Sequence, residues 1–227
     1  MTIDDIKNGG KTIIKKLKTS NNYILSVKAA CGDVGATIQL FTEIGKATLS
    51  LPDELFYSKL ECFLNGVDFK DEERAKMRFW IASNGYEKDN GIRLISYINN
   101  AESMKKVEYF ANATRCALNY GLNLELYFRI CNAIDISLEE DLKFLAENIP
   151  KNYEKNFTQN YFTQKLYAAG LMDVVTYVRD NGKHHFNPLA KLIDVCSISF
   201  SNDTKYPNPK RTINEINAIL ISQSGGL

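Results

Sequence analysis

The sequence predicts a mainly α-helical protein with one β-hairpin close to its C-terminus. Through most of the first 150 residues, apolar side chains recur every three or four positions, which is the period of an amphipathic helix. Around the dipeptide Asn181-Gly182, apolar and polar residues alternate instead, which is the period of a strand. With 227 residues, 44% of them hydrophobic, the chain can bury a core without a disulfide or metal staple.

The N-terminal half reads as a series of short helices. Residues 11–18 predict a short basic helix and residues 34–49 an apolar one. The next helix is expected to begin at Pro52, to carry an apolar stripe from Leu55 to Leu64, and to stop at Gly66. Further helices are expected to start near Asp71, Ile92, Met104 and Leu124, the third of them ending near Gly121.

Two later helices carry capping signals. The pattern Ser137-x-x-Glu140 predicts a capping box, and Pro150 is expected to close the helix that it opens. Residues 201–211 contain two prolines and no periodicity, so they read as a linker. Beyond this linker, Thr212-x-x-Glu215 predicts the start of a final amphipathic helix.

Composition indicates a reduced, cytoplasmic protein. The formal net charge is +1, from 28 basic and 27 acidic residues, which gives no global attraction to nucleic acid or to an anionic membrane. The five cysteines lie far apart among mostly apolar residues, as buried free thiols do. Neither a signal peptide nor an apolar run long enough to span a bilayer is apparent.

The hairpin signal is the most specific in the chain. Asp180-Asn181-Gly182-Lys183 matches a type I′ turn, whose two central residues need positive φ. The preceding helix is expected to end at Gly170 and to be anchored by its apolar residues, and the following helix to begin at Asn187-Pro188. These anchors are Tyr161, Phe162, Leu166, Tyr167 and Leu171.

This order of helix, strand, wing, strand and helix resembles the winged-helix superfamily. The resemblance depends on Ala168 to Met172, on the Asn181-Gly182 wing, and on Phe186 to Ala190, and it covers about residues 122–200. It implies three parts: a helical domain at 1–121, a winged-helix-like domain at 122–200, and a linker with an amphipathic helix at 201–227.

The overall layout is also similar to uncharacterised helical bacterial and prophage proteins. The similarity depends on Phe56 to Leu60 with Phe63-Leu64, and it brings no agreed activity. Lysine outnumbers arginine by 21 to 7, a bias that AT-rich genomes produce, so a bacterial or phage source is expected.

If the unit binds DNA, as that superfamily often does, the helix before the hairpin, residues 158–166, would enter the major groove. Amide and hydroxyl side chains there could pair with base edges, and cations on the wing would contact phosphate. The expected contact residues are Gln159, Asn160, Thr163, Gln164, Lys165, Arg179, Lys183 and His184. Because so few cations lie among them, a protein partner is favoured over DNA.

No catalytic, cofactor-binding or metal-binding residues are predicted. The only histidines, His184 and His185, are neighbours on a strand and would point to opposite faces. The acidic triplets 71–73 and 139–141 suit helix N-termini. We therefore expect a non-enzymatic protein that acts through macromolecular contacts, with a DNA-binding transcriptional regulator as the alternative. The final helix is expected to pack back on its own domain, with a homodimer as the alternative, through its apolar residues Ile213, Ile216, Ile219 and Leu220.

Overall fold

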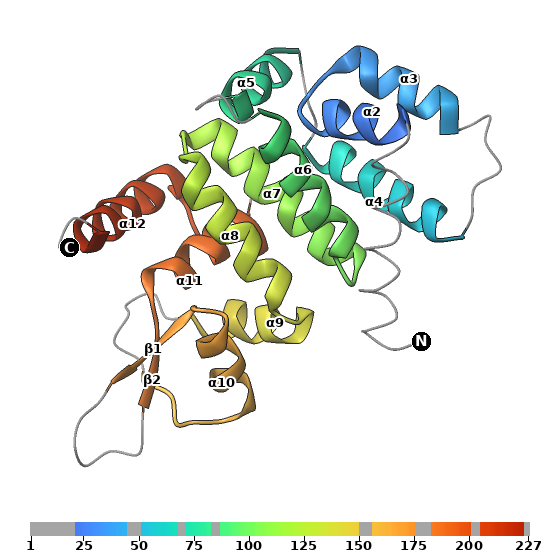
Figure 1. Cartoon of the computed structure of the whole chain (residues 1–227). Helices are drawn as coiled ribbons and strands as arrows, with labels where there is room; N and C mark the ends of the chain where they lie inside the picture. The colour runs from blue at the N-terminus through green and yellow to red at the C-terminus, as the bar shows by residue number, and fades with distance from the viewer. Residues whose placement is uncertain are drawn as a thin grey trace. The chain divides into compact units, whose positions relative to one another are not determined.

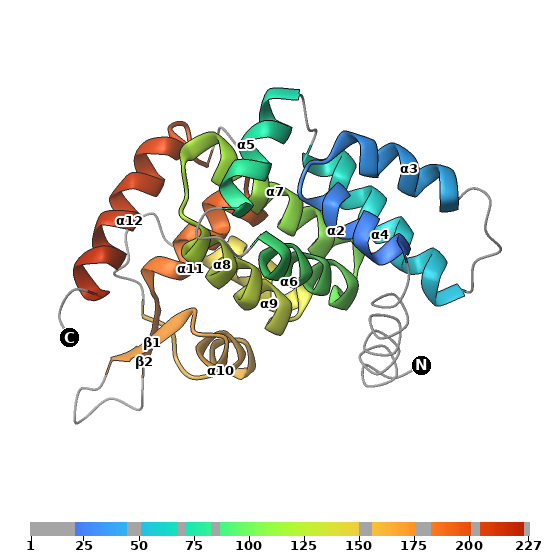
Figure 2. The same ribbon diagram turned by 45° about the horizontal axis from the view of Figure 1, so that its top comes forward.

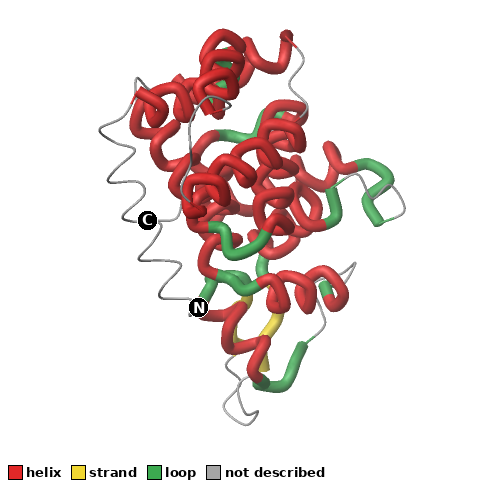
Figure 3. Tube along the Cα trace, turned by 90° about the vertical axis from the view of Figure 1, so that its right-hand side faces the viewer, coloured by secondary structure: helices red, strands yellow, loops and turns green. Residues whose placement is uncertain are grey.

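The computed structural model describes residues 21–44, 51–67, 71–82, 87–149, 156–175, 183–200 and 205–224. The described residues form eleven α-helices, one π-helix and a single two-stranded antiparallel hairpin, which confirms the mainly α-helical prediction (Figure 3). The chain divides into two compact units, residues 1–111 and 112–227. The basic helix expected at 11–18 lies outside the described residues.

The first unit is entirely helical in its described part. Its helices pack around α6, which lies against α2, α4 and α5 (Figure 1). Their bounds are α2 Asn21–Ala30, α3 Val34–Ile44, α4 Leu51–Val67, α5 Asp71–Ala82, α6 Glu87–Asn100 and the start of α7, Met104–Tyr120. The core is built from apolar residues of α4 to α7, including Phe56, Leu60, Phe63, Met77, Ile81, Leu94, Ile98 and Phe110.

The prediction that Gly66 stops α4 is wrong. The helix continues to Val67, and Gly66 is not among the glycines with positive φ. A Cβ atom at Gly66 would lie 2.8 Å from the Cβ of Ala111, a distance that real Cβ atoms do not reach. Gly66 therefore allows α4 and α7 to approach closely, and it does not serve as a cap.

The second unit combines helices with the hairpin. It contains the end of α7 and then α8 Leu124–Ile136, α9 Glu139–Asn148, α10 Tyr161–Ala168, β1 Met172–Val175, β2 Lys183–Phe186, α11 Pro188–Ile193, the π-helix η2 Asp194–Ile198 and α12 Pro209–Ser224. Helix α11 packs on α8 and α12, and η2 packs on α9 and α12. Both ribbon views show α12 beside α11 (Figures 1 and 2).

The predicted order of helix, hairpin and helix is present between α10 and α11. Gly170 has a φ of 72° and ends α10, as the sequence predicted. Strands β1 and β2 pair in antiparallel register, with Met172 opposite Phe186 and Val174 opposite His184. Asn187 caps α11, since its Oδ1 accepts a hydrogen bond from the backbone N–H of Ala190 at 3.1 Å. The turn at 176–182, which includes Asn181-Gly182, lies outside the described residues.

The capping box expected at Ser137 is wrong by one residue. Ser137 follows α8, and its hydroxyl donates a hydrogen bond back to the Ala133 carbonyl at 2.7 Å. The N-cap of α9 is Leu138, whose N–H donates to Asp141 Oδ2 at 3.2 Å. The acidic residue that closes this turn is thus Asp141 rather than Glu140. Pro150 lies outside the described residues.

Helix α12 begins three residues earlier than predicted. Asn208 is its capping residue, because Asn208 Oδ1 accepts from the Arg211 N–H at 3.1 Å, and Pro209 occupies the first helical position. Thr212 therefore lies inside the first turn. Glu215 accepts from Arg211 Nε at 2.8 Å instead of closing a capping box.

Candidate partner-binding surface

Helix α10 presents two different faces. Thr163 and Leu166 are fully buried against the rest of the unit. We call the opposite side the outer face of α10; its members follow the i, i+3, i+4, i+7 spacing of one helical face, and all are exposed. They are Tyr161, Gln164, Lys165 and Ala168.

The N-terminus of α10 is closed by a reciprocal cap. Asn160 Oδ1 accepts from the Thr163 N–H at 2.9 Å, while Thr163 Oγ1 accepts from the Asn160 N–H at 2.8 Å. The sequence had placed both side chains among the contact residues. Their polar atoms stabilise the helix start instead, and buried Thr163 is not presented at the surface.

The hairpin likewise has an inner and an outer face. Side chains directly opposite each other on paired strands share a face, so His184 lies on the same side as Val174, Met172 and Phe186. His184 is only 5% exposed, and its ring lies 5.6 Å from that of Tyr167. The expectation that His184 would contact a phosphate is therefore not met, because the register turns it inward.

The other expected contact residues lie in three places. Gln159 is exposed just before the cap of α10, and Gln164 and Lys165 belong to its outer face. Lys183 is half-buried at the start of β2. Arg179 lies outside the described residues. The structure thus brings Gln159, Gln164 and Lys165 together on one short helix and its entry.

A chain of aromatic rings, which we call the aromatic row, leads from the core to this surface. Phe186 contacts Phe157 with ring centroids 5.2 Å apart, and Phe157 contacts Phe144 at 6.2 Å. Phe144 stacks on Phe162 at 4.9 Å with an interplanar angle of 6°, and Phe162 meets Tyr161 edge-on at 5.7 Å. The row joins β2, the segment before α10, α9 and α10.

The aromatic row ends in solvent. Phe144, Phe157 and Phe162 are half-buried, whereas Tyr161 is 57% exposed and the nearby Tyr167 is 50% exposed. The prediction that both tyrosines anchor α10 in the core is therefore wrong. Tyr161 lies on the outer face of α10, whereas Tyr167 lies at its flank, four residues after buried Thr163 and with its ring 5.6 Å from that of His184.

Lys165 is the only cation on α10, and its ammonium lies 5.5 Å from the centroid of the Tyr161 ring. None of the described carboxylates pairs with it. Three other exposed cations among the described residues have such partners three or four residues away. These pairs are Lys105–Glu108, Arg129–Glu125 and Arg211–Glu215.

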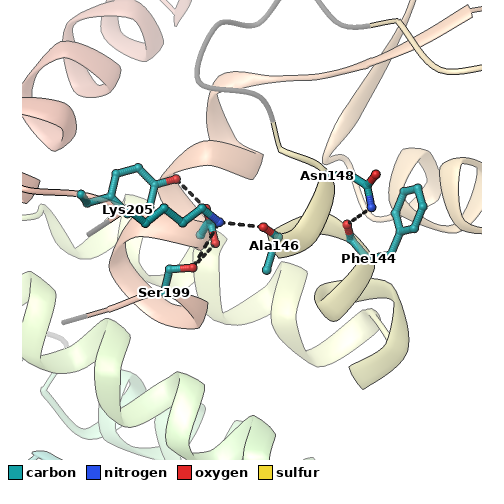
Figure 4. Close-up of polar contacts among 7 residues, drawn as sticks. Phe144, Ala146, Asn148, Ser199 and Lys205 are labelled. Atoms are coloured by element: carbon teal, nitrogen blue, oxygen red, sulfur yellow. Dashed lines mark hydrogen bonds and ion pairs between the residues drawn. The ribbon is translucent and has the colours of Figure 1, made fainter. Parts of the chain in front are cut away.

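The densest polar cluster lies elsewhere in the unit, around fully buried Asp194 (Figure 4). Asp194 Oδ1 accepts from the Ser199 hydroxyl at 2.6 Å, and Oδ2 accepts from the Tyr206 hydroxyl and the Lys205 ammonium, both at 2.5 Å. Lys205 also donates to the carbonyl of Ala146 in α9 at 2.7 Å. The cluster ties the chain before α12 to η2 and to the end of α9.

This Asp194 cluster has the composition of a structural anchor. Both carboxylate oxygens are engaged, and Lys205 has three acceptors around its ammonium group. The sequence reading missed it, since Lys205 was assigned to the linker. A single aspartate within the apolar stretch Leu192 to Ile198 was the one signal that pointed to a buried partner.

The surroundings of two cysteines raise the pKa of their thiols. Cys31, Cys116, Cys131 and Cys196 are buried and Cys62 is half-buried, and all five are free. Burial, together with the neighbouring Cys116 thiol, raises the pKa of Cys196 well above its ordinary value. Burial and the nearby Glu108 carboxylate raise the pKa of Cys62. Raised values keep these thiols protonated and poorly nucleophilic at neutral pH.

Among the described residues, no three His, Cys, Asp or Glu side chains are grouped as a metal site would require. Within the same residues, no helix combines the length and apolar character needed to cross a bilayer.

Comparisons of the chain with protein-family models, with curated proteins and with solved structures found no match.

Proposed function

We propose that the protein acts by binding a protein partner through the outer face of α10 and the exposed end of the aromatic row, with no catalytic step of its own. The observation that carries this proposal is the exposure of Tyr161 and Tyr167 on a helix that bears a single cation. Tyrosine is enriched at the energetic centres of protein–protein interfaces, whereas charged residues are depleted there.

DNA binding is the second candidate function. It is supported by the helix–hairpin–helix order and by Gln159, Gln164 and Lys165 at the surface. Phosphate contacts supply most of the affinity for DNA, and a recognition helix usually has several cations around it. Helix α9, which packs against α10, carries exposed Glu140 and Glu147 against one exposed lysine, Lys143, so it supplies no net positive charge for phosphate. The protein partner is therefore the better supported proposal.

The proposal places the protein in the cytoplasm of a bacterium or phage-infected cell, with a winged-helix relationship for its C-terminal unit. The proposal also includes a homodimer that forms through α12. Ile213 and Ile216 are buried within the chain's own unit, so Ile219, which is 39% exposed, would be central to such a contact. Light scattering of an Ile219→Glu variant tests this; an unchanged molecular mass would count against the α12 dimer.

Affinity capture from a lysate of the source organism tests the main proposal. Wild-type protein should retain a partner that Tyr161→Ala loses. Ile136→Ala, an equally exposed apolar site on α8 (54%), should retain it and serves as the matched control.

A parallel gel-shift with a 30-base-pair duplex at low and moderate salt tests the alternative, DNA binding. Steeply salt-dependent duplex binding, without a Tyr161-dependent protein partner, would favour the DNA-binding function.

A further inference from the structure

We propose that the outer face of α10 recognises a short linear peptide segment in which carboxylates flank an apolar side chain. This inference rests on the proposed protein-binding function and specifies the chemistry of the partner. Three observations support it: the charge of Lys165, which no described carboxylate pairs with, the aromatic anchor beside that charge, and the size of the surface.

The charge is the first step. No residue three or four positions from Lys165 is acidic, and its ammonium lies over the Tyr161 ring without a described carboxylate partner. Because the ring face attracts the ammonium, the positive charge is held beside the aromatic surface rather than extended into solvent. A carboxylate that binds next to Tyr161 would therefore contact the Lys165 ammonium, which is already held over the ring.

The aromatic anchor is the second step. Tyr161 and half-buried Phe162 continue the row of rings that reaches fully buried Phe186. The Phe144 ring stacks on the Phe162 ring and holds it in place. The Phe162 and Tyr161 rings therefore form a packed surface for an apolar side chain. Tyrosine is among the residues enriched at interface hot spots.

Size and surrounding charge are the third step. Eight helical residues extend about 12 Å, far too little for an interface of about 800 Å² per partner, as a stable dimer needs. A short segment fits better than a second folded copy. Neighbouring α9 carries exposed Glu140 and Glu147 together with exposed Lys143, so it adds no net positive charge to this surface. The single cation of α10 therefore matches one or two carboxylates better than a nucleic acid backbone, which needs several cations.

Fluorescence anisotropy with three labelled eight-residue probes tests the inference. The probes share alternating Leu and Phe and differ in the intervening residues, which are Asp, Asn or Lys. Wild-type protein should bind the Asp probe at least tenfold more tightly than the Lys probe. Lys165→Glu should reverse that order, whereas Lys210→Glu, an exposed lysine on α12, should leave it unchanged. Equal binding of the Asp and Lys probes by wild type would overturn the inference.

The same assay separates this inference from the proposed function. If Tyr161→Ala weakens every probe while Lys165→Glu has no effect on their order, the surface binds peptides and the acidic preference is wrong. If neither variant changes binding of any probe, the outer face of α10 is not the binding surface, and the proposed function fails with it.

An unlabelled 20-nucleotide single strand is added as competitor. Displacement of the Asp probe with a salt slope steeper than about −2 would overturn the inference in favour of nucleic acid.

Discussion

Replacing Lys205 by methionine should destabilise the protein through the Asp194 cluster. Methionine keeps the length and most of the apolar stem of lysine but removes the ammonium group. In the native structure that group contacts Asp194 Oδ2 at 2.5 Å and the Ala146 carbonyl at 2.7 Å. The variant therefore leaves the buried carboxylate without its counter-charge, and the Ala146 carbonyl loses the hydrogen bond that it accepts from Lys205.

The size of the effect follows from burial. Removing one partner of a buried ion pair costs about 3–5 kcal/mol, because the remaining charge stays in the interior. Asp194 is completely buried, which favours a cost near the upper end of this range. The Lys205 side chain is 26% exposed, and the hydroxyls of Ser199 and Tyr206 still donate to the carboxylate. We therefore expect the lower end, about 3 kcal/mol.

Urea denaturation monitored by circular dichroism measures this loss. Lys210→Met, an exposed lysine on α12, is the matched control and should change the free energy of unfolding by no more than about 0.5 kcal/mol. The double variant Asp194→Asn/Lys205→Met carries no buried charge, so it should be more stable than Lys205→Met alone. A loss below about 1 kcal/mol for Lys205→Met, or strict additivity in the double variant, would refute the reasoning.

Two further predictions concern buried and half-buried side chains of the first unit. Burial lowers the pKa of Lys59 below 10.5. Between the lowered pKa and 10.5 the unfolded chain holds more protons than the native one, so stability rises with pH in that window. Lys59→Met removes both the charge and the hydrogen bond that Lys59 Nζ donates to the Asn99 carbonyl at 2.9 Å. The stability of this variant relative to wild type should therefore be highest at neutral pH and should fall as the pH rises towards 10.5 in urea melts, and a pH-independent difference would contradict this account. Separately, an aromatic disulfide reagent should label Cys62 alone in native protein, and slowly, because its pKa is raised. All five cysteines should react in denaturant, and rapid native labelling of a second thiol would show that the buried cysteines are accessible.

Local patterns explain which parts of the fold the sequence predicted. The period of apolar residues predicted the helices, and the residues around Asn181-Gly182 predicted the hairpin; both depend on interactions between near neighbours. Gly170 and Asn187 were placed correctly at helix ends for the same reason, since a cap is a contact within one turn.

Competing local partners account for the errors at helix starts. Ser137 and Thr212 each stand three residues before an acidic side chain, so both matched a capping box. In each case a residue four positions earlier made the better contact: the Ala133 carbonyl accepts from the Ser137 hydroxyl, and Asn208 caps α12 in place of Thr212. Which of two adjacent candidates caps a helix depends on where the preceding helix ends.

The sequence by itself determined the helical class, the hairpin and the charge of the chain, because these follow from composition and from residues close together in sequence. Only the tertiary structure decided which side chains reach solvent. Tyr161 is exposed and His184 buried because α10 and the hairpin each pack one particular face, and neither face is encoded locally. The Asp194–Lys205 pair joins residues eleven positions apart across an apparent linker, so no periodic pattern could reveal it.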